Sequence, residues 1–154
     1  MKKIAIIGAG ISGLFIANLF KRNANYQITI YEKDNSVALE EGYGVQLSVN
    51  CIKLLNKIGF NKLQNDEIFT PKKINFYSNK SSNKICELDI SDFNTEDCKY
   101  TTLKRSTLIN FLKEDLVNQI KTGYNISKID QQGKQIKLSF ENNEIKECDY
   151  LIIA

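Results

Sequence analysis

The sequence predicts an α/β fold in which a parallel sheet is combined with a small antiparallel β-meander. Three observations indicate this: the apolar run Lys3–Ile7 leads directly into a glycine-rich turn, a helical pattern of apolar residues follows, and Gln135–Phe140 alternates apolar and polar residues. With 154 residues, 42% of them hydrophobic, the chain is long enough for one domain with its own core. We therefore expect residues 1–154 to form a single domain.

The first 32 residues match a β-α-β unit. Lys3–Ile7 is predicted to be a buried strand, and Ile11–Arg22 a helix that ends at Asn23-Ala24-Asn25. Gln27–Tyr31 is predicted to be a second strand, with Glu32 at its carboxyl end.

The middle of the chain is predicted to mix short elements. We expect a loop or short helix over Lys33–Glu41, an extended segment over Gly42–Leu47, and a helix over Val49–Ile58. Ile74–Ser78 and Lys84–Ile90 are expected to form a hairpin, because turn-forming residues separate them.

The last third is predicted to hold one long helix and a meander. Leu108, Phe111, Leu112, Leu116 and Ile120 form an apolar stripe, which predicts a helix over Thr102–Lys121 with Ser106 or Thr107 as its N-cap and Gly123 as its stop. The meander is expected to use Ile126–Asp130, Gln135–Phe140 and Ile145–Ala154 and to return to the parallel sheet. The run Tyr150–Ala154 is expected to be a strand buried on both faces.

The composition excludes several kinds of site. The chain has no histidine, which excludes Ser-His-Asp and Cys-His catalytic systems and zinc sites of the Cys/His type. The four cysteines are far apart, and we expect them to be reduced, mostly structural thiols. The net charge of +3 comes from scattered lysines, so no nucleic-acid partner is expected. No metal site is expected either.

The apolar run at the start of the chain is no membrane or export signal. Ile4–Ile7 is too short to cross a bilayer, and Gly8 follows it at once, unlike the core of a signal peptide. We expect a cytoplasmic protein without a transmembrane segment.

The glycine-rich turn carries a dinucleotide-binding fingerprint. Gly8-Ala9-Gly10-Ile11-Ser12-Gly13 is a G-x-G-x-x-G motif between a strand and a helix, and an acidic residue, Glu32, ends the next strand. The glycines are expected to allow a tight turn, a close approach of the pyrophosphate and close helix–strand packing. The N–H groups at the start of the helix would face the phosphates. Glu32 would accept hydrogen bonds from the ribose and repel a 2′-phosphate, which argues against NADP at this site.

Later segments resemble the FAD-dependent aromatic-ring hydroxylases, the group A flavoprotein monooxygenases. One family stretch is similar to residues 42–50, GYGVQLSVN, together with Leu54-Leu55 and Ile58-Gly59. The family's R-x-x-L helix start resembles residues 104–108, KRSTL. Its x-D-x-(L/V)-I-x-A strand resembles residues 148–154, CDYLIIA. The resemblance implies a Rossmann-like FAD-binding domain with a parallel sheet and a β-meander, truncated before the substrate half. It covers essentially the whole chain.

The resemblance also implies roles for individual residues. Gly8, Ala9, Gly10, Ile11, Ser12 and Gly13 would hold the pyrophosphate of FAD, with Glu32 and Lys33 at the adenosine ribose. The backbone of Ile126 would lie against the adenine, and Val45 near the flavin. Arg105 would contact the ribityl and phosphate region, which suits one of only two arginines in a lysine-rich chain. No catalytic residue is assigned.

Three functions remain open from the sequence. The first is the N-terminal FAD-binding part of a monooxygenase that hydroxylates aromatic substrates with NADH or NADPH and oxygen. It is expected to be inactive alone, as either a truncated product or one half of a split gene whose C-terminal half is encoded separately. The second is a non-catalytic remnant that binds nucleotide weakly. The third is an NAD-binding module of another oxidoreductase, which the later family-like segments disfavour.

Overall fold

The computed structural model describes residues 1–37, 43–63, 65–133 and 135–154. They fall into two compact units, one made of Met1–Glu41 with Leu108–Ala154 and the other of Gly42–Thr107. Each unit is described by itself below.

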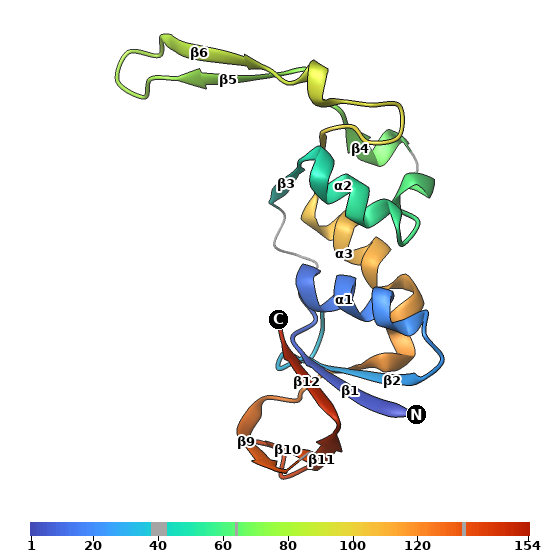
Figure 1. Cartoon of the computed structure of the whole chain (residues 1–154). Helices are drawn as coiled ribbons and strands as arrows, with labels where there is room; N and C mark the ends of the chain where they lie inside the picture. The colour runs from blue at the N-terminus through green and yellow to red at the C-terminus, as the bar shows by residue number, and fades with distance from the viewer. Residues whose placement is uncertain (38–42, 64, 134) are drawn as a thin grey trace. The chain divides into compact units, whose positions relative to one another are not determined.

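A four-stranded parallel sheet forms the centre of the first unit. Its order is β12-β1-β2-β8 (Figure 1), and its strands are β1 Lys2–Ile7, β2 Tyr26–Tyr31, β8 Ile120–Lys121 and β12 Tyr150–Ile153. β1 pairs with β2 and with β12, so that Ile7 lies between Tyr31 and Ile153 in the register. The carboxyl ends of these strands therefore meet at one edge, which is where ligands of open α/β sheets bind.

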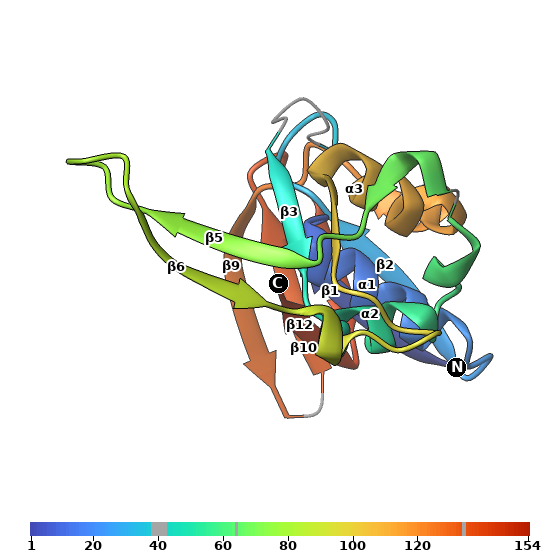
Figure 2. The same ribbon diagram turned by 90° about the horizontal axis from the view of Figure 1, so that it is seen from above.

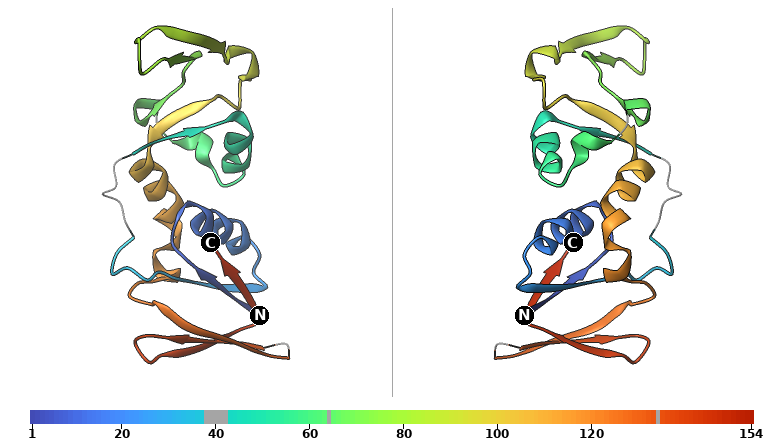
Figure 3. Two further views of the ribbon diagram at one scale, coloured as in Figure 1. Left: turned by 90° about the vertical axis from the view of Figure 1, so that its left-hand side faces the viewer. Right: turned by 90° about the vertical axis from the view of Figure 1, so that its right-hand side faces the viewer.

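The two faces of this sheet are covered by different elements. Helix α1, Ile11–Lys21, packs on one face through its buried residues Gly13, Leu14 and Ala17. The meander of β9 Ile126–Gln132, β10 Gln135–Phe140 and β11 Ile145–Cys148 lies on the other face, as the two side views in Figure 3 show. Because neighbouring side chains of a strand point to opposite faces, β1 contributes to both layers.

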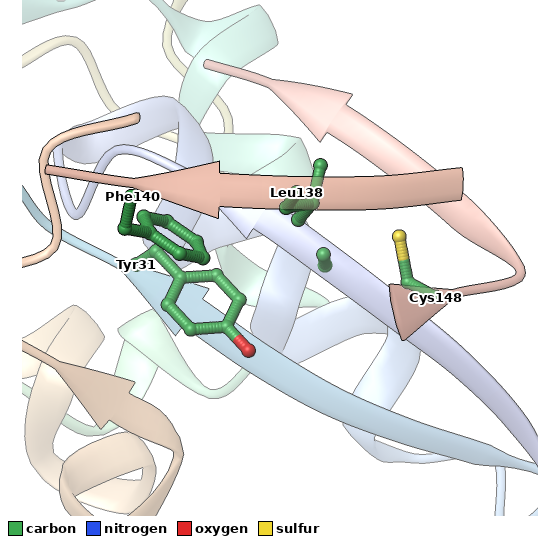
Figure 4. Close-up of a cluster of buried hydrophobic side chains, with 5 residues drawn as sticks. Tyr31, Leu138, Phe140 and Cys148 are labelled. Atoms are coloured by element: carbon green, nitrogen blue, oxygen red, sulfur yellow. The ribbon is translucent and has the colours of Figure 1, made fainter. Parts of the chain in front are cut away.

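The contact between sheet and meander is a small aromatic and aliphatic core. Ala5 and Tyr31 of the sheet pack with Leu138, Phe140 and Cys148 of the meander (Figure 4). The alternation predicted for Gln135–Phe140 is confirmed: Leu138 and Phe140 are buried in this core, and Ile136 packs against it.

The second unit contains an antiparallel sheet, a helix and a hairpin. The sheet has the order β3-β7-β4, from β3 Gly44–Leu47, β7 Thr101–Lys104 and β4 Ile68–Phe69, next to helix α2, Val49–Asn56. Short 3-10 helices occupy Phe60–Lys62, Asn65–Glu67 and Ser91–Phe93. The predicted hairpin is confirmed: β5 Lys73–Tyr77 pairs antiparallel with β6 Lys84–Asp89, and it forms a two-stranded ribbon that extends beyond the rest of its unit (Figure 2).

The prediction of one helix over Thr102–Lys121 is wrong at both ends. Thr101–Lys104 is a strand, because it pairs with β3 and buries Thr101 and Leu103 on alternate positions. Helix α3 begins at Arg105 and ends at Lys113, so neither Ser106 nor Thr107 is its N-cap, and Gly123 does not end it. A 3-10 helix over Glu114–Gln119 and strand β8 follow. The predicted stripe is nevertheless buried at Leu108, Leu112 and Leu116 across both helical segments.

The prediction for the last strand is also partly wrong. β12 does return to the parallel sheet, but it is an edge strand of the described sheet rather than a central one. The side chain of Ile153 is accordingly 71% exposed. Asp149 separates β12 from β11, so the predicted single run Ile145–Ala154 is two strands in two sheets.

Several other expectations are confirmed within a residue or two. α1 and α2 occupy the predicted helical segments, and Gly59, with φ of 96°, follows the second of them. Residues 33–37 form bends without a helix, whereas 38–41 and Gly42 lie outside the described residues. The four cysteines are free, but Cys51 and Cys86 are exposed, so only Cys148 fits the expectation of a buried structural thiol well.

Candidate nucleotide-binding cleft

The glycine-rich turn between β1 and α1 has the geometry that its sequence predicts. Gly8 has φ of 103°, a conformation that favours glycine, and its N–H donates to the carbonyl oxygen of Tyr31 at 2.8 Å. A Cβ on Gly13 would lie 2.1 Å from the carbonyl oxygen of Gly8. Only glycine therefore allows the first turn of α1 to lie this close to the end of β1.

Gly10 stands at the entrance of helix α1 and is open on its outer side. It is the N-cap residue, and a Cβ placed on it would meet no heavy atom within 4 Å. The missing side chain thus serves no contact within the protein and leaves space beside the backbone. Ile11 and Ser12 begin the helix, whose first N–H groups have no carbonyl partner inside the helix. Since the first turn carries no acidic residue, this end of the helix is suited to a phosphate.

Glu32 connects the end of β2 to the glycine-rich turn. Its Oε2 atom accepts a hydrogen bond from the N–H of Ala9 at 2.7 Å, and its Oε1 atom accepts one from the N–H of Asp34 at 3.2 Å. The carboxylate therefore lies directly beside the turn that the fingerprint assigns to the pyrophosphate. That position is where a dinucleotide ribose is held in Rossmann-type folds.

A second stretch of backbone closes the site from the other side. The N–H of Tyr124 donates to the carbonyl oxygen of Glu32 at 2.8 Å, and the N–H of Gly123 donates to that of Asp34 at 2.9 Å. Gly123 has φ of 73°, so its role is to turn the chain here. These bonds fix residues 123–126 next to the end of β2.

These elements together surround a cleft of about 310 Å³ at the carboxyl edge of the parallel sheet. It is lined by predicted residues Gly8, Gly10, Glu32, Lys33 and Ile126, and by Ile7, Tyr31, Tyr124, Asn125, Ile153 and Ala154. Five of the residues predicted from sequence, spread over more than a hundred positions, are thus brought together. Ala9, Ile11, Ser12 and Gly13 belong to the same turn and helix start but do not line the cleft.

Sequence reasoning missed six lining residues: four lie at or just after the ends of β1, β2 and β12, and two lie in the segment before β9. Tyr124 and Asn125 directly precede the predicted Ile126, and only the backbone bonds to Glu32 and Asp34 reveal that they lie in the site. A larger hollow of about 740 Å³ lies in the second unit, lined by residues such as Asn56, Phe60 and Thr101. It contains none of the predicted binding residues, so size alone does not identify the site.

Val45 and Arg105, the two residues predicted to lie near the flavin, belong to the second unit. Val45 pairs with Leu103 in the β3-β7 ladder. The backbone N–H of Arg105 donates to the carbonyl oxygen of Tyr43 at 2.9 Å, at the first residue of α3. Their roles stay predictions.

Within the described ranges, no three of the acidic and cysteine side chains gather in a way that would hold a metal ion. None of the helices seen in the described part is long and apolar enough to cross a membrane.

Comparison with known proteins supports this description of the fold. Residues 6–40 match the family model of an NAD(P)-binding Rossmann-like domain, which covers the glycine-rich turn and Glu32. No curated protein sequence matches the chain.

Solved structures match nearly the whole chain. The 2,6-dihydroxypyridine-3-hydroxylase of Arthrobacter nicotinovorans superimposes with a TM-score of 0.77 at 16% identity, over 97% of this chain and 36% of that one. Klebsiella pneumoniae HpxO, complexed with FAD and uric acid, superimposes with a TM-score of 0.78 at 15% identity, over 97% of this chain and 38% of that one. The tetracycline destructase Tet(55) superimposes with a TM-score of 0.77 at 19% identity, over 100% of this chain and 38% of that one.

The chain has the fold of FAD-dependent monooxygenases. It spans less than two fifths of the length of these three structures. The match covers nearly the whole chain, so both units belong to the part of the monooxygenase fold that this chain contains.

Proposed function

We propose that this chain is the N-terminal FAD-binding part of a flavin-dependent monooxygenase that hydroxylates aromatic substrates with NADH or NADPH and oxygen. The observation that carries this proposal is the cleft, in which the glycine-rich turn, Glu32 and Ile126 come together within a monooxygenase fold. HpxO, which shares the fold, is solved with FAD and uric acid.

The residues of the cleft fit the ADP half of FAD. The space beside Gly10 and the N–H groups of Ile11 and Ser12 suit the pyrophosphate, since nothing in the protein fills that position. Glu32 would accept from the ribose hydroxyls, and Lys33 would lie beside them. Ile126 would lie against the adenine, while Val45 and Arg105 would meet the flavin side of the molecule.

The chemistry of such an enzyme belongs to the flavin, which takes a hydride from the nicotinamide and reacts with oxygen. The contribution of this chain is binding and orientation. The start of helix α1 offsets the negative charge of the phosphates, and the carboxylate of Glu32 disfavours a ribose that carries a 2′-phosphate. We assign no acid or base in this chain.

The remaining part of the site would come from further polypeptide. The solved structures are more than twice as long as the part that this chain matches. A substrate pocket and the contacts to the isoalloxazine are proposed to lie in the part that this chain does not match, which a separately encoded C-terminal half would supply. We expect residues 1–154 alone to bind FAD weakly and to show no hydroxylation. Purified chain that is yellow with stoichiometric flavin would contradict this expectation.

An NAD-binding module of another oxidoreductase is the second candidate, because the family model that matches residues 6–40 is an NAD(P)-binding one. Fluorescence anisotropy of FAD, with ADP, FMN and NAD as competitors, separates the two. The proposal predicts that FAD binds, that ADP displaces it and that FMN does not. Displacement by NAD at lower concentrations than ADP would favour the second candidate and overturn the first.

A further inference from the structure

Tyr124 joins the proposed nucleotide cleft to the meander behind it. Its backbone N–H donates to Glu32, as described above, and its side chain contacts the meander. The phenol donates a hydrogen bond to Glu144 Oε1 at 2.7 Å, and Glu144 Oε2 is paired with Lys146 Nζ at 2.5 Å. The ion pair and this hydrogen bond lower the pKa of Glu144, and the hydrogen bond raises the pKa of Tyr124. The side chain of Tyr124 is therefore held by the ionised carboxylate of Glu144 in the meander.

The ring is also held by two aromatic neighbours. The centroids of Tyr124 and Phe140 are 5.1 Å apart at an angle of 85°, an edge-to-face arrangement. Tyr31 lies 5.3 Å from Tyr124 and 4.8 Å from Phe140, and Figure 4 shows Tyr31 and Phe140 side by side between sheet and meander. Tyr31 and Tyr124 both line the cleft, whereas Phe140 does not.

The order of groups along the cleft places a base near Tyr124. With the pyrophosphate at Gly8–Gly10 and the ribose at Glu32, the base would contact the rest of the cleft lining. Two of the described lining residues carry aromatic rings, Tyr31 and Tyr124. Tyr31 is only 7% exposed and lies in the core between sheet and meander, whereas Tyr124 is half-buried, so Tyr124 offers the accessible ring. Stacking of a base on an aromatic side chain contributes enough to change affinity about tenfold.

We propose that Tyr124 is the residue that recognises the adenine in this cleft, by ring contact, and that Glu144 is a positioning residue that holds the ring in place. The proposal rests on the proposed nucleotide-binding function, because it assigns the base end of the same site. It gives the meander a role in ligand binding beyond covering the sheet.

The test uses 1,N6-etheno-ADP, whose fluorescence falls when its base stacks on an aromatic ring. Wild-type protein is expected to quench the probe on binding. Tyr124→Leu should bind it about tenfold more weakly and without quenching. Tyr124→Phe keeps the ring but loses the bond to Glu144, so its quenching should lie between those of wild type and Tyr124→Leu and match that of Glu144→Ala. Tyr150→Leu is the matched control, since Tyr150 is 52% exposed and does not line the cleft.

The role of Glu144 is tested by the same signal. Glu144→Ala should reduce quenching at saturation, and Glu144→Gln, which can still accept from Tyr124, should restore part of it. Glu147→Ala, in the same meander strand region but bonded to Gln135 instead, should behave as wild type. A loss of fold stability alone would lower the melting temperature without lowering quenching at saturation.

The outcomes separate the two proposals. Failure of the wild-type chain to bind etheno-ADP would overturn the proposed nucleotide site and this assignment with it. Normal binding and quenching by folded Tyr124→Leu would overturn only the role of Tyr124. If Tyr124→Leu does not fold, the result for Glu144→Ala decides: unchanged quenching at saturation would contradict the proposal.

Discussion

The carboxylate of Glu32 accepts a hydrogen bond from the backbone N–H of Ala9 at 2.7 Å, across 23 residues of chain. This bond ties the end of β2 to the glycine-rich turn that follows β1. An ionised carboxylate has about four acceptor positions, and two are used here, by Ala9 and Asp34. Glu32 can therefore shape the turn and still accept from ribose hydroxyls.

Replacing Glu32 by Ala is expected to weaken ADP binding about tenfold, because a charge-assisted hydrogen bond contributes roughly 1.5–3 kcal/mol. It should also reduce the preference for ADP over 2′,5′-ADP, since the repulsion of the 2′-phosphate is removed. Titration calorimetry with both nucleotides measures this. Glu32→Gln keeps one acceptor oxygen, so its affinity for ADP should lie between those of wild type and Glu32→Ala. An unchanged preference in Glu32→Ala would count against a ribose role for this residue.

Gly10→Val is expected to weaken nucleotide binding strongly while leaving the fold intact. A Cβ at this position meets no heavy atom within 4 Å, so the side chain collides only with a ligand in the space beside the turn. Calorimetry with ADP and thermal unfolding of the free protein together make the test. Equal affinity for ADP in the variant and wild type would show that the pyrophosphate does not approach here.

Gly13→Ala is expected to lower the stability of the fold. Its Cβ would lie 2.1 Å from the carbonyl oxygen of Gly8, so α1 must move away from β1, at a cost of about 1–3 kcal/mol in the free energy of unfolding. Urea unfolding checks this, with Gly10→Ala as the comparison that should unfold like wild type. Equal stability of the two alanine variants would contradict the close helix–strand packing.

Asp149 is expected to stabilise the junction of β12 and β1 in a pH-dependent way. Its Oδ2 accepts from the N–H of Lys3 at 2.7 Å, and this bond lowers the pKa of the carboxyl group. Because the pKa is lower in the folded state, the stabilisation is present above the unfolded pKa of about 3.9 and disappears as pH falls through the folded value.

Asp149→Asn should therefore melt at a lower temperature than wild type at pH 7, and the difference should shrink as pH falls below about 3.9 and through the lowered folded-state pKa of Asp149. Thermal unfolding at several pH values gives the comparison. Asp130→Asn, on the exposed meander strand, serves as the control. A difference in melting temperature that does not change with pH would rule out the ionised form as the cause.

Local patterns of sequence were sufficient for much of the fold. The β-α-β unit, the hairpin around residues 79–83 and the alternation of Leu138 and Phe140 are each set by neighbours along the chain, and all are present. The long helix failed because Thr101 and Leu103 are fixed by pairing with β3, more than fifty residues away. Periodicity cannot show such partners, and tertiary pairing overrode the helical pattern.

Only part of the candidate site could be predicted from local sequence patterns. Gly8, Gly10 and Glu32 were predictable because the fingerprint fixes their spacing. The bond from Ala9 to Glu32 and the place of Tyr124 depend on contacts between distant segments. A tyrosine two residues before Ile126 gives no signal in the sequence that it lines a cleft or that Glu144 holds its ring.

The central claim, that the cleft binds the ADP half of FAD, is tested most directly by the melting temperature of the purified chain with added ligand. A ligand at a hundred times its Kd stabilises a folded protein by about 2.7 kcal/mol. We predict that saturating ADP and FAD both raise the melting temperature of wild-type protein and leave that of Gly10→Val unchanged. No rise with either ligand, or an equal rise in Gly10→Val, would contradict the account.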